Sequence, residues 1–137
     1  NVNDICEVAI TAAGGGADAI TAVNTVRAMA IDVETMRPIL ANKIGGLSGA
    51  AIKPIALRCV FEIYREVKIP ILGCGGTTDW RDAVEFFLAG ASAVQIGTAI
   101  ALNEVKVFKE VAEGVDQYLM RKGFDNVKEI VGLAHEQ

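Results

Sequence analysis

Two glycine-containing pairs follow neighbouring predicted strands, and their chemistry suits the binding of an anion. Gly75-Gly76 follows a predicted strand at 69–73, and Gly97-Thr98 ends another at 93–97. Glycines at strand ends let backbone N–H groups approach an anion closely, and a following helix N-terminus adds a favourable dipole. Each pair could also serve the turn conformation alone. Together they predict a site for the phosphate of a cofactor or substrate.

Asn24-Thr25 follows the first predicted strand, at 18–23, and supplies an amide and a hydroxyl. An amide both donates and accepts, so it matches the imide or carboxamide edge of a small polar substrate. Ordinary turn chemistry would also place Asn and Thr here. The glycine-rich segment 42–49 could lie over a flat ligand or form a mobile surface loop.

The remaining reactive side chains favour structural roles. Cys74 lies at a strand end, but no histidine is near it in sequence to act as a base, so we expect a buried thiol. His135, the single histidine, is expected to be an exposed tail residue. Cys6 and Cys59 fall on apolar helix faces, and Trp80 is expected to pack. No catalytic residue and no metal ligand set is predicted.

Alternating helices and strands must position these residues, and this order predicts a parallel α/β sheet built from βαβ units. Asp4 is predicted to cap the first helix and Thr78 the third. A long connection with little periodicity follows the first strand, and connections of this length are usually functional. The predicted helices cover about 4–13, 52–66, 78–89, 104–122 and 127–133, and the strands 18–23, 69–73 and 93–97.

Composition and charge argue against several classes of function. The 137 residues are 52% hydrophobic with a net charge of −4, and no basic stripe is present, which argues against a nucleic-acid partner. No apolar run approaches the roughly 18 residues of a membrane span. Three scattered cysteines form neither a disulfide scaffold nor a Cys-x-x-Cys metal site. We therefore expect a cytoplasmic protein without a membrane or nucleic-acid partner.

Six segments occur in one order with one spacing and together resemble a known family. They closely resemble the C-terminal half of dihydroorotate dehydrogenase, class 1B catalytic subunit, from Asn1 to about Ala134. A TIM barrel needs roughly 250 residues, so we expect residues 1–137 to be the C-terminal part of a single FMN-binding barrel domain, with about three parallel strands and flanking helices. The segments are Asn24-Thr25, 29–35, 45–49, 52–57, Gly75-Gly76 and 95–98.

The resemblance implies FMN-dependent oxidation of dihydroorotate to orotate in pyrimidine biosynthesis, with a role for eight residues of this chain. Gly75, Gly76, Gly97 and Thr98 would hold the flavin phosphate. Val23 and Gly49 would touch the flavin, and Asn24 and Thr25 would bind the orotate ring. The family's 1B enzymes also imply a homodimer and a second subunit that carries FAD and an iron–sulfur cluster.

One departure concerns catalysis. The family's active-site base is a cysteine in the first half of the barrel, and Cys74 does not match that position. We therefore expect the isolated chain to be inactive. Two alternatives remain open from the sequence: a non-catalytic α/β phosphate-binding half-barrel module that pairs with another half, and a related flavin enzyme that acts on another pyrimidine.

Overall fold

The computed structural model describes residues 2–136, and its centre is a three-stranded parallel sheet. The strand order is β1-β6-β7, with Ile20 opposite Ile71 and Leu72 opposite Ala93. The strands are β1 (Ile20–Ala22), β6 (Ile71–Cys74) and β7 (Ala93–Gln95). The predicted parallel α/β sheet is therefore confirmed, and each strand is somewhat shorter than predicted.

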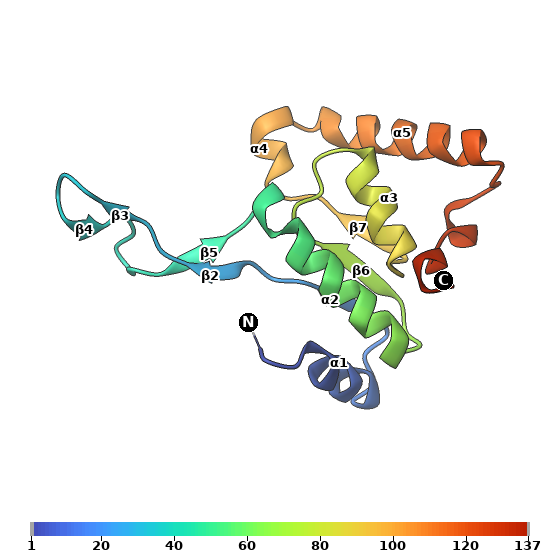
Figure 1. Ribbon diagram of the computed structural model, residues 1–137, viewed down its shortest axis with the longest axis horizontal. Coiled ribbons are helices and arrows are strands. Elements are labelled where there is room, and N and C mark those ends of the chain that lie inside the picture. Colours follow the sequence, from blue (N-terminus) through green and yellow to red (C-terminus); the bar gives the residue numbers. More distant parts are fainter. Residues whose placement is uncertain (1, 137) are drawn as a thin grey trace.

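Helices connect the strands and pack on the sheet. They are α1 (Ile5–Gly14), α2 (Lys53–Glu66), α3 (Trp80–Leu88), α4 (Ala99–Asn103) and α5 (Lys106–Lys122). In Figure 1, α1 lies beneath α2 at the bottom of the view, and α5 lies along the top and packs on α3. Both connections between the parallel strands run through a helix, as the βαβ interpretation predicts.

Two apolar clusters hold these layers together. The first joins α1, α2 and the sheet, with Val60, Ile63, Ile71 and Phe86 almost completely buried. The second joins α3, α5 and the C-terminal segment around Val107 and other branched residues. The α3 helix contributes to both clusters, so its position is fixed from two sides.

Helix caps agree in part with the sequence predictions. Asp4 caps α1, accepting hydrogen bonds from the backbone N–H groups of Cys6 and Glu7. The α3 cap is Asp79, so the prediction of Thr78 is wrong. Asp79 accepts from Asp82 N while the Asp82 carboxylate accepts from the Asp79 backbone, and Thr78 bonds that same carboxylate instead. This reciprocal box places the helix start one residue later.

The long connection after β1 is an antiparallel arm rather than an irregular loop (Figure 1). Its inner part pairs Val26 with Leu47, and a shorter pair follows further out. The strands are β2 (Val26–Ala28), β3 (Ile31–Asp32), β4 (Arg37–Pro38) and β5 (Gly45–Leu47). The segment 42–49 therefore does not form a separate loop, because it consists mostly of β5 and the turn before it.

The C-terminal segments also differ from prediction. The predicted helix at 104–122 is confirmed as α5, which begins at Lys106, while the short helix α4 before it was not predicted and is separated from α5 at Glu104, with a φ of 55°. Gly123 ends α5 in the left-handed conformation, as predicted. The predicted helix at 127–133 is replaced by two short 3-10 turns, η2 (Val127–Glu129) and η3 (Leu133–His135).

Candidate functional site

The carboxyl ends of β1, β6 and β7 meet the inner end of the arm around a cavity of about 170 Å³. Ligands of parallel α/β folds bind at this end of the strands. The cavity is smaller than the roughly 300–1,000 Å³ of pockets that enclose a whole drug-sized ligand, so it fits one group of a larger molecule. All eight predicted site residues line it: Val23, Asn24, Thr25, Gly49, Gly75, Gly76, Gly97 and Thr98.

The structure adds lining residues that the sequence analysis did not assign to the site. Thr98 Oγ1 lies 2.8 Å from Ser48 Oγ, and this contact joins the loop after β7 to the end of the arm. Ser48 directly precedes a predicted site glycine, which is a signal that could have identified it. The added residues are Ser48, Ile52, Cys74, Thr77, Gln95 and Ala99.

The glycines of the loop after β6 leave no room for a side chain. Gly76 has a φ of 85°, and a Cβ there would lie 2.9 Å from both the Gly49 carbonyl oxygen and the Lys53 nitrogen. A Cβ on Gly75, with a φ of 134°, would lie 2.7 Å from the Ala56 Cβ. Glycine is therefore required here for conformation and for close packing on the first turns of α2.

The same loop carries polar groups that have no protein partner within residues 2–136. The backbone N–H groups of Gly76 and Thr77 donate to no protein acceptor. Thr77 is 3% exposed, and its buried Oγ1 also has no partner. Buried polar groups are almost always hydrogen-bonded, so this loop offers donors to a ligand. A phosphate group, which accepts from several donors at once, fits this set.

The electrostatics of the cavity also suit an anion. Among its described lining residues no carboxylate occurs, so nothing there repels a negative charge. Cys74 is its titratable side chain, and burial raises the pKa of that thiol. Cys74 is therefore neither an activated nucleophile nor an anion at neutral pH.

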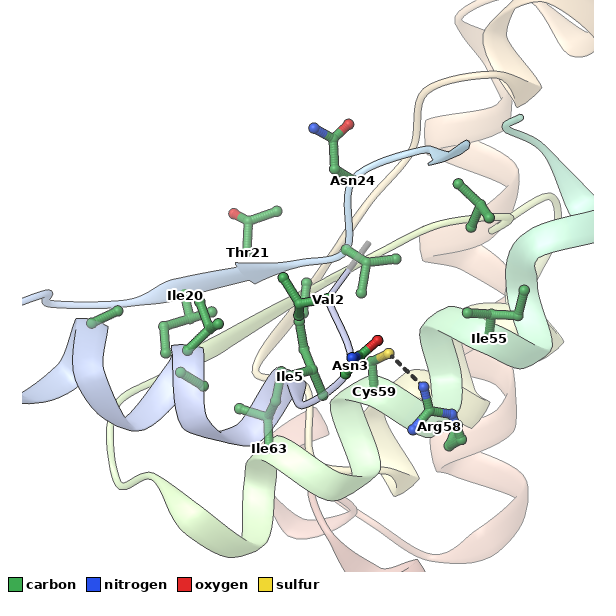
Figure 2. A pocket seen from close by; sticks show the side chains of 16 residues that line it. Val2, Asn3, Ile5, Ile20, Thr21, Asn24, Ile55, Arg58, Cys59 and Ile63 are labelled. Atoms are coloured by element: carbon green, nitrogen blue, oxygen red, sulfur yellow. Dashed lines mark hydrogen bonds between the residues drawn. The ribbon is translucent and has the colours of Figure 1, made fainter. Parts of the chain in front are cut away.

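Asn24 and Thr25 lie at the outer side of this cavity, exposed at the end of β1. Asn24 Oδ1 accepts from the Thr25 backbone N–H at 2.7 Å, which fixes the orientation of the amide. Figure 2 shows Asn24 and Thr21 directed away from α1 and α2. An oriented amide on this open face can contact a polar ring.

A second, larger cavity of about 330 Å³ lies on the other face of β1, between α1 and α2 (Figure 2). Its walls are mostly apolar, and Val8 and Ile55 are half exposed there. Cys59, predicted to be a core residue, is 5% exposed at this position. The cavity borders the edge of β1 that pairs with no strand among the described residues.

His135 lies far from these strand ends, and its predicted exposure is wrong. Its ring stacks on Phe61 with a centroid distance of 3.8 Å, and Nε2 lies 3.0 Å from the Ala89 carbonyl oxygen. Trp80 packs against Tyr118 and the second apolar cluster, as predicted. Within residues 2–136, no group of three His, Cys, Asp or Glu side chains is placed to hold a metal.

Comparisons with known proteins point to one family. The sequence model of the family described as dihydroorotate dehydrogenase matches residues 1–119. The chain is 56% identical over 134 residues to the dihydroorotate dehydrogenase B (NAD(+)) catalytic subunit of Pyrococcus horikoshii, covering 98% of this chain and 44% of the relative. It is 54% identical to the protein of the same name from Thermococcus kodakarensis, covering 99% and 45%. The chain thus spans less than half the length of these relatives.

Proposed function

The chain belongs to the dihydroorotate dehydrogenase family, and from this premise we propose that it supplies the flavin-phosphate site of an FMN-dependent enzyme. That enzyme oxidises dihydroorotate to orotate, an oxidoreductase reaction of pyrimidine biosynthesis. The observation that carries the proposal is the convergence of Gly75, Gly76, Gly97 and Thr98 on one cavity with unpaired N–H donors. Backbone donors at strand ends are a common way to hold a phosphate.

We propose that residues 1–137 are the C-terminal part of a single (β/α)8 barrel domain. Three parallel strands with helical connections are what a section of such a barrel contains. Within residues 2–136, β1 and β7 each have one edge without a neighbouring strand. The apolar cavity beside β1 supports this proposal, because another strand and helix of a barrel would cover it.

The proposed division of labour follows from position. Val23 and Gly49 would contact the flavin next to the phosphate cavity, while Asn24 and Thr25 would hold the orotate ring at the exposed end of β1. A bound flavin would supply the hydride acceptor for the oxidation. Cys74 does not match the position of the family's base, and burial raises the pKa of its thiol, so that the thiol is protonated at neutral pH. We therefore propose that the base that removes the substrate proton is not among these residues. The isolated chain is therefore inactive.

Partners follow from the same proposal. The relatives are named as the NAD(+)-linked catalytic subunit, a name that implies a second subunit for electron transfer. That subunit would carry FAD and an iron–sulfur cluster, because a cluster needs a set of cysteine ligands. The three cysteines of this chain come from three different elements, α1, α2 and β6, and do not form a group of ligands among the described residues. A homodimer of catalytic subunits completes the proposed assembly.

Membership of this family favours the enzyme over a free-standing phosphate-binding module. The unpaired edges and the anion cavity would suit both, but relatives at 54–56% identity carry the enzyme's name. A related enzyme that acts on another pyrimidine would differ at the ring contacts around Asn24 and Thr25.

Comparison of FMN with riboflavin tests the phosphate site, because the two ligands differ only by the phosphate group. We expect fluorescence titrations to show that the chain binds FMN about tenfold or more tightly than riboflavin, as charge-assisted hydrogen bonds to phosphate would give. In Gly76→Asp, the added side chain would displace the closely packed loop and its carboxylate would repel the phosphate, so this preference should be lost. Gly123→Asp is the control, since Gly123 has a similar φ of 79° with open space around it. Equal affinities of the wild-type chain for both flavins would contradict the proposal.

A further inference from the structure

The loop that carries Gly75 and Gly76 is held from two sides. On one side its glycines pack on the first turns of α2, so closely that a Cβ on Gly76 would overlap Lys53. On the other side it runs into the first turn of α3 through Thr78 and Asp79. The position of the loop therefore depends on how the beginnings of α2 and α3 are joined.

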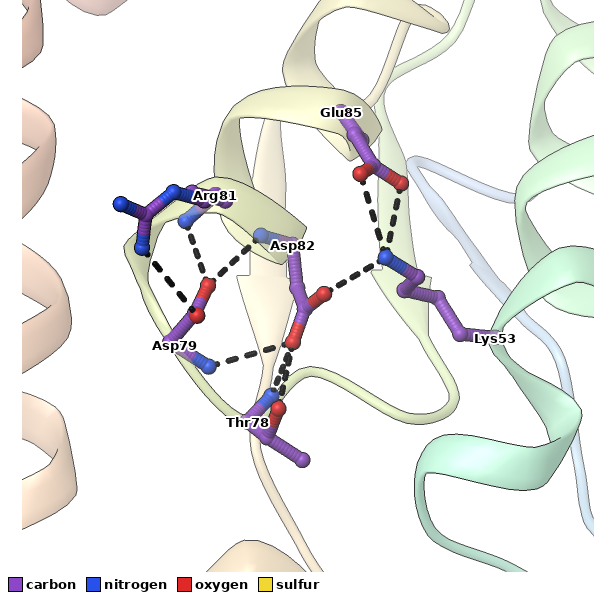
Figure 3. A network of polar contacts seen from close by, with 6 residues as sticks. All are labelled: Lys53, Thr78, Asp79, Arg81, Asp82 and Glu85. Atoms are coloured by element: carbon purple, nitrogen blue, oxygen red, sulfur yellow. Dashed lines mark hydrogen bonds and ion pairs between the residues drawn. The ribbon is translucent and has the colours of Figure 1, made fainter.

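One pair of charged side chains makes that connection (Figure 3). Lys53 Nζ, at the start of α2, lies 2.7 Å from Asp82 Oδ1 and 3.0 Å from Glu85 Oε2, both on α3. The other oxygen of Asp82 accepts from the Thr78 N–H at 2.8 Å, from the Thr78 hydroxyl at 2.6 Å and from the Asp79 N–H at 3.2 Å. The carboxylate thus bridges α2 and the final residues of the loop.

Burial makes the charged state of Asp82 depend on this connection. Asp82 is 8% exposed, so its charge has little access to water and depends on these partners. Burial alone would raise the pKa of Asp82, but the hydrogen bonds from Lys53, Thr78 and Asp79 outweigh it and lower the pKa. The bond to Asp82 likewise raises the pKa of Lys53. Both groups are charged across the neutral range.

We propose that Lys53 and Asp82 are positioning residues for the phosphate site, and that their ion pair orients the loop 75–79 so that its unpaired N–H groups face the phosphate. This inference rests on the proposed function. Asp82 takes the N–H groups of Thr78 and Asp79 for itself, while those of Gly76 and Thr77 have no acceptor among the described residues. The two sets of donors therefore point to different acceptors.

Neither residue contacts the phosphate cavity directly. Lys53 and Asp82 are both absent from its lining residues, although a lysine near a phosphate would ordinarily be interpreted as its ligand. Lys53 reaches Asp82 and Glu85 of α3 (Figure 3), so its charge is neutralised by two carboxylates. Its effect on the ligand must therefore be exerted through the loop.

The ratio of FMN to riboflavin affinity measures loop orientation separately from overall stability. We expect Lys53→Met to lower that ratio about tenfold, the effect of losing one charge-assisted hydrogen bond to phosphate, and to change riboflavin affinity little. Lys53→Arg should restore the ratio. Arg58→Met is the matched control, because it removes an exposed ion pair with Glu62 from the same helix.

A second variant keeps the test decisive where Lys53→Met does not fold. Asp82→Asn keeps the side-chain shape and removes the charge, and it should lower the ratio in the same direction. An unchanged ratio in a folded Lys53→Met or Asp82→Asn chain, with folding checked by circular dichroism, would overturn the inference. Equal affinities of the wild-type chain for FMN and riboflavin would instead contradict the proposed function itself. The two failures are therefore distinguishable.

Discussion

The contacts of Asp82 bear on both the stability of the fold and the geometry of the candidate site. It is a buried carboxylate whose partners come from α2, from the loop after β6 and from the α3 cap. Removing one partner of such a group leaves the others unpaired, which costs more than an exposed ion pair contributes. Sequence inspection could identify Asp82 only as a favourable charge in a first helical turn.

This residue gives a pH prediction with a definite sign. The folded-state pKa of Asp82 lies below its unfolded value, so its contribution is present above the unfolded pKa, about 3.9, and is lost as the pH falls through the folded pKa. At neutral pH we expect Asp82→Asn to lower the free energy of unfolding by about 1–3 kcal/mol.

Denaturant unfolding followed by circular dichroism between pH 7 and pH 2.5 checks this expectation. The difference between the wild-type chain and Asp82→Asn should narrow towards acid, where the wild-type carboxylate becomes protonated. A difference that stays constant or widens below pH 4 would show that the charge of Asp82 does not stabilise the fold. Glu85, the other carboxylate on Lys53, is unchanged in both chains.

The candidate site was largely accessible from the sequence, because residues after parallel strands gather at one edge of a sheet. Seven of the eight predicted residues line one cavity for this reason, whereas Gly49 follows the antiparallel strand β5 and was assigned only from the family resemblance. Ser48 and the Lys53–Asp82 pair were not found, since the contacts that matter join residues 29 or 50 positions apart. The stacking of His135 on Phe61 depends on tertiary packing in the same way.

At the scale of elements, segments with strong hydrophobic periodicity were predicted correctly, and segments with weak periodicity were not. The helices α1, α2, α3 and α5 each bury one apolar face, and the sequence shows it. The arm was missed because its strands are two or three residues long and pair across a long intervening segment. Two of the three residues of β5 are glycine, which is atypical of strands.

The packing of α3 on α5 predicts that a Gly→Ala substitution in α5 destabilises the protein, whereas helix propensity alone would predict stabilisation. Replacing a glycine within a helix by alanine ordinarily stabilises it by roughly 0.5–1 kcal/mol. At Gly114, however, an added Cβ would overlap Trp80 at its Cβ, Cγ and Cδ1 atoms. Because overpacking costs about 1–3 kcal/mol, we expect Gly114→Ala to lower the free energy of unfolding by about 1–2 kcal/mol.

Thermal and urea unfolding of the purified variant measure this effect. Ala112→Gly, an exposed position two residues earlier on α5, is the control for propensity and should cost about 1 kcal/mol. If Gly114→Ala were more stable than the wild-type chain, Trp80 would not pack against α5 as the structure has it.

At the scale of the whole molecule, large hydrophobic side chains are exposed in two places. Large hydrophobic side chains are exposed along the arm, where Val33 is 78% and Met36 84% exposed, and others border the cavity beside β1. Contiguous exposed apolar surface usually marks an interface. No helix within residues 2–136 is long and apolar enough to cross a membrane. These surfaces fit the proposal of a barrel section that other strands and subunits cover.

A chimera tests the central claim most directly. This chain would replace the matching segment of the Pyrococcus horikoshii relative, of which it covers 44%. The measurement is bleaching of the bound flavin when dihydroorotate is added without oxygen. We predict that the purified chimera carries FMN, that dihydroorotate reduces it, and that the Gly76→Asp chimera does neither. A folded chimera that binds no FMN, or whose FMN dihydroorotate leaves oxidised, would contradict the proposed function of this chain.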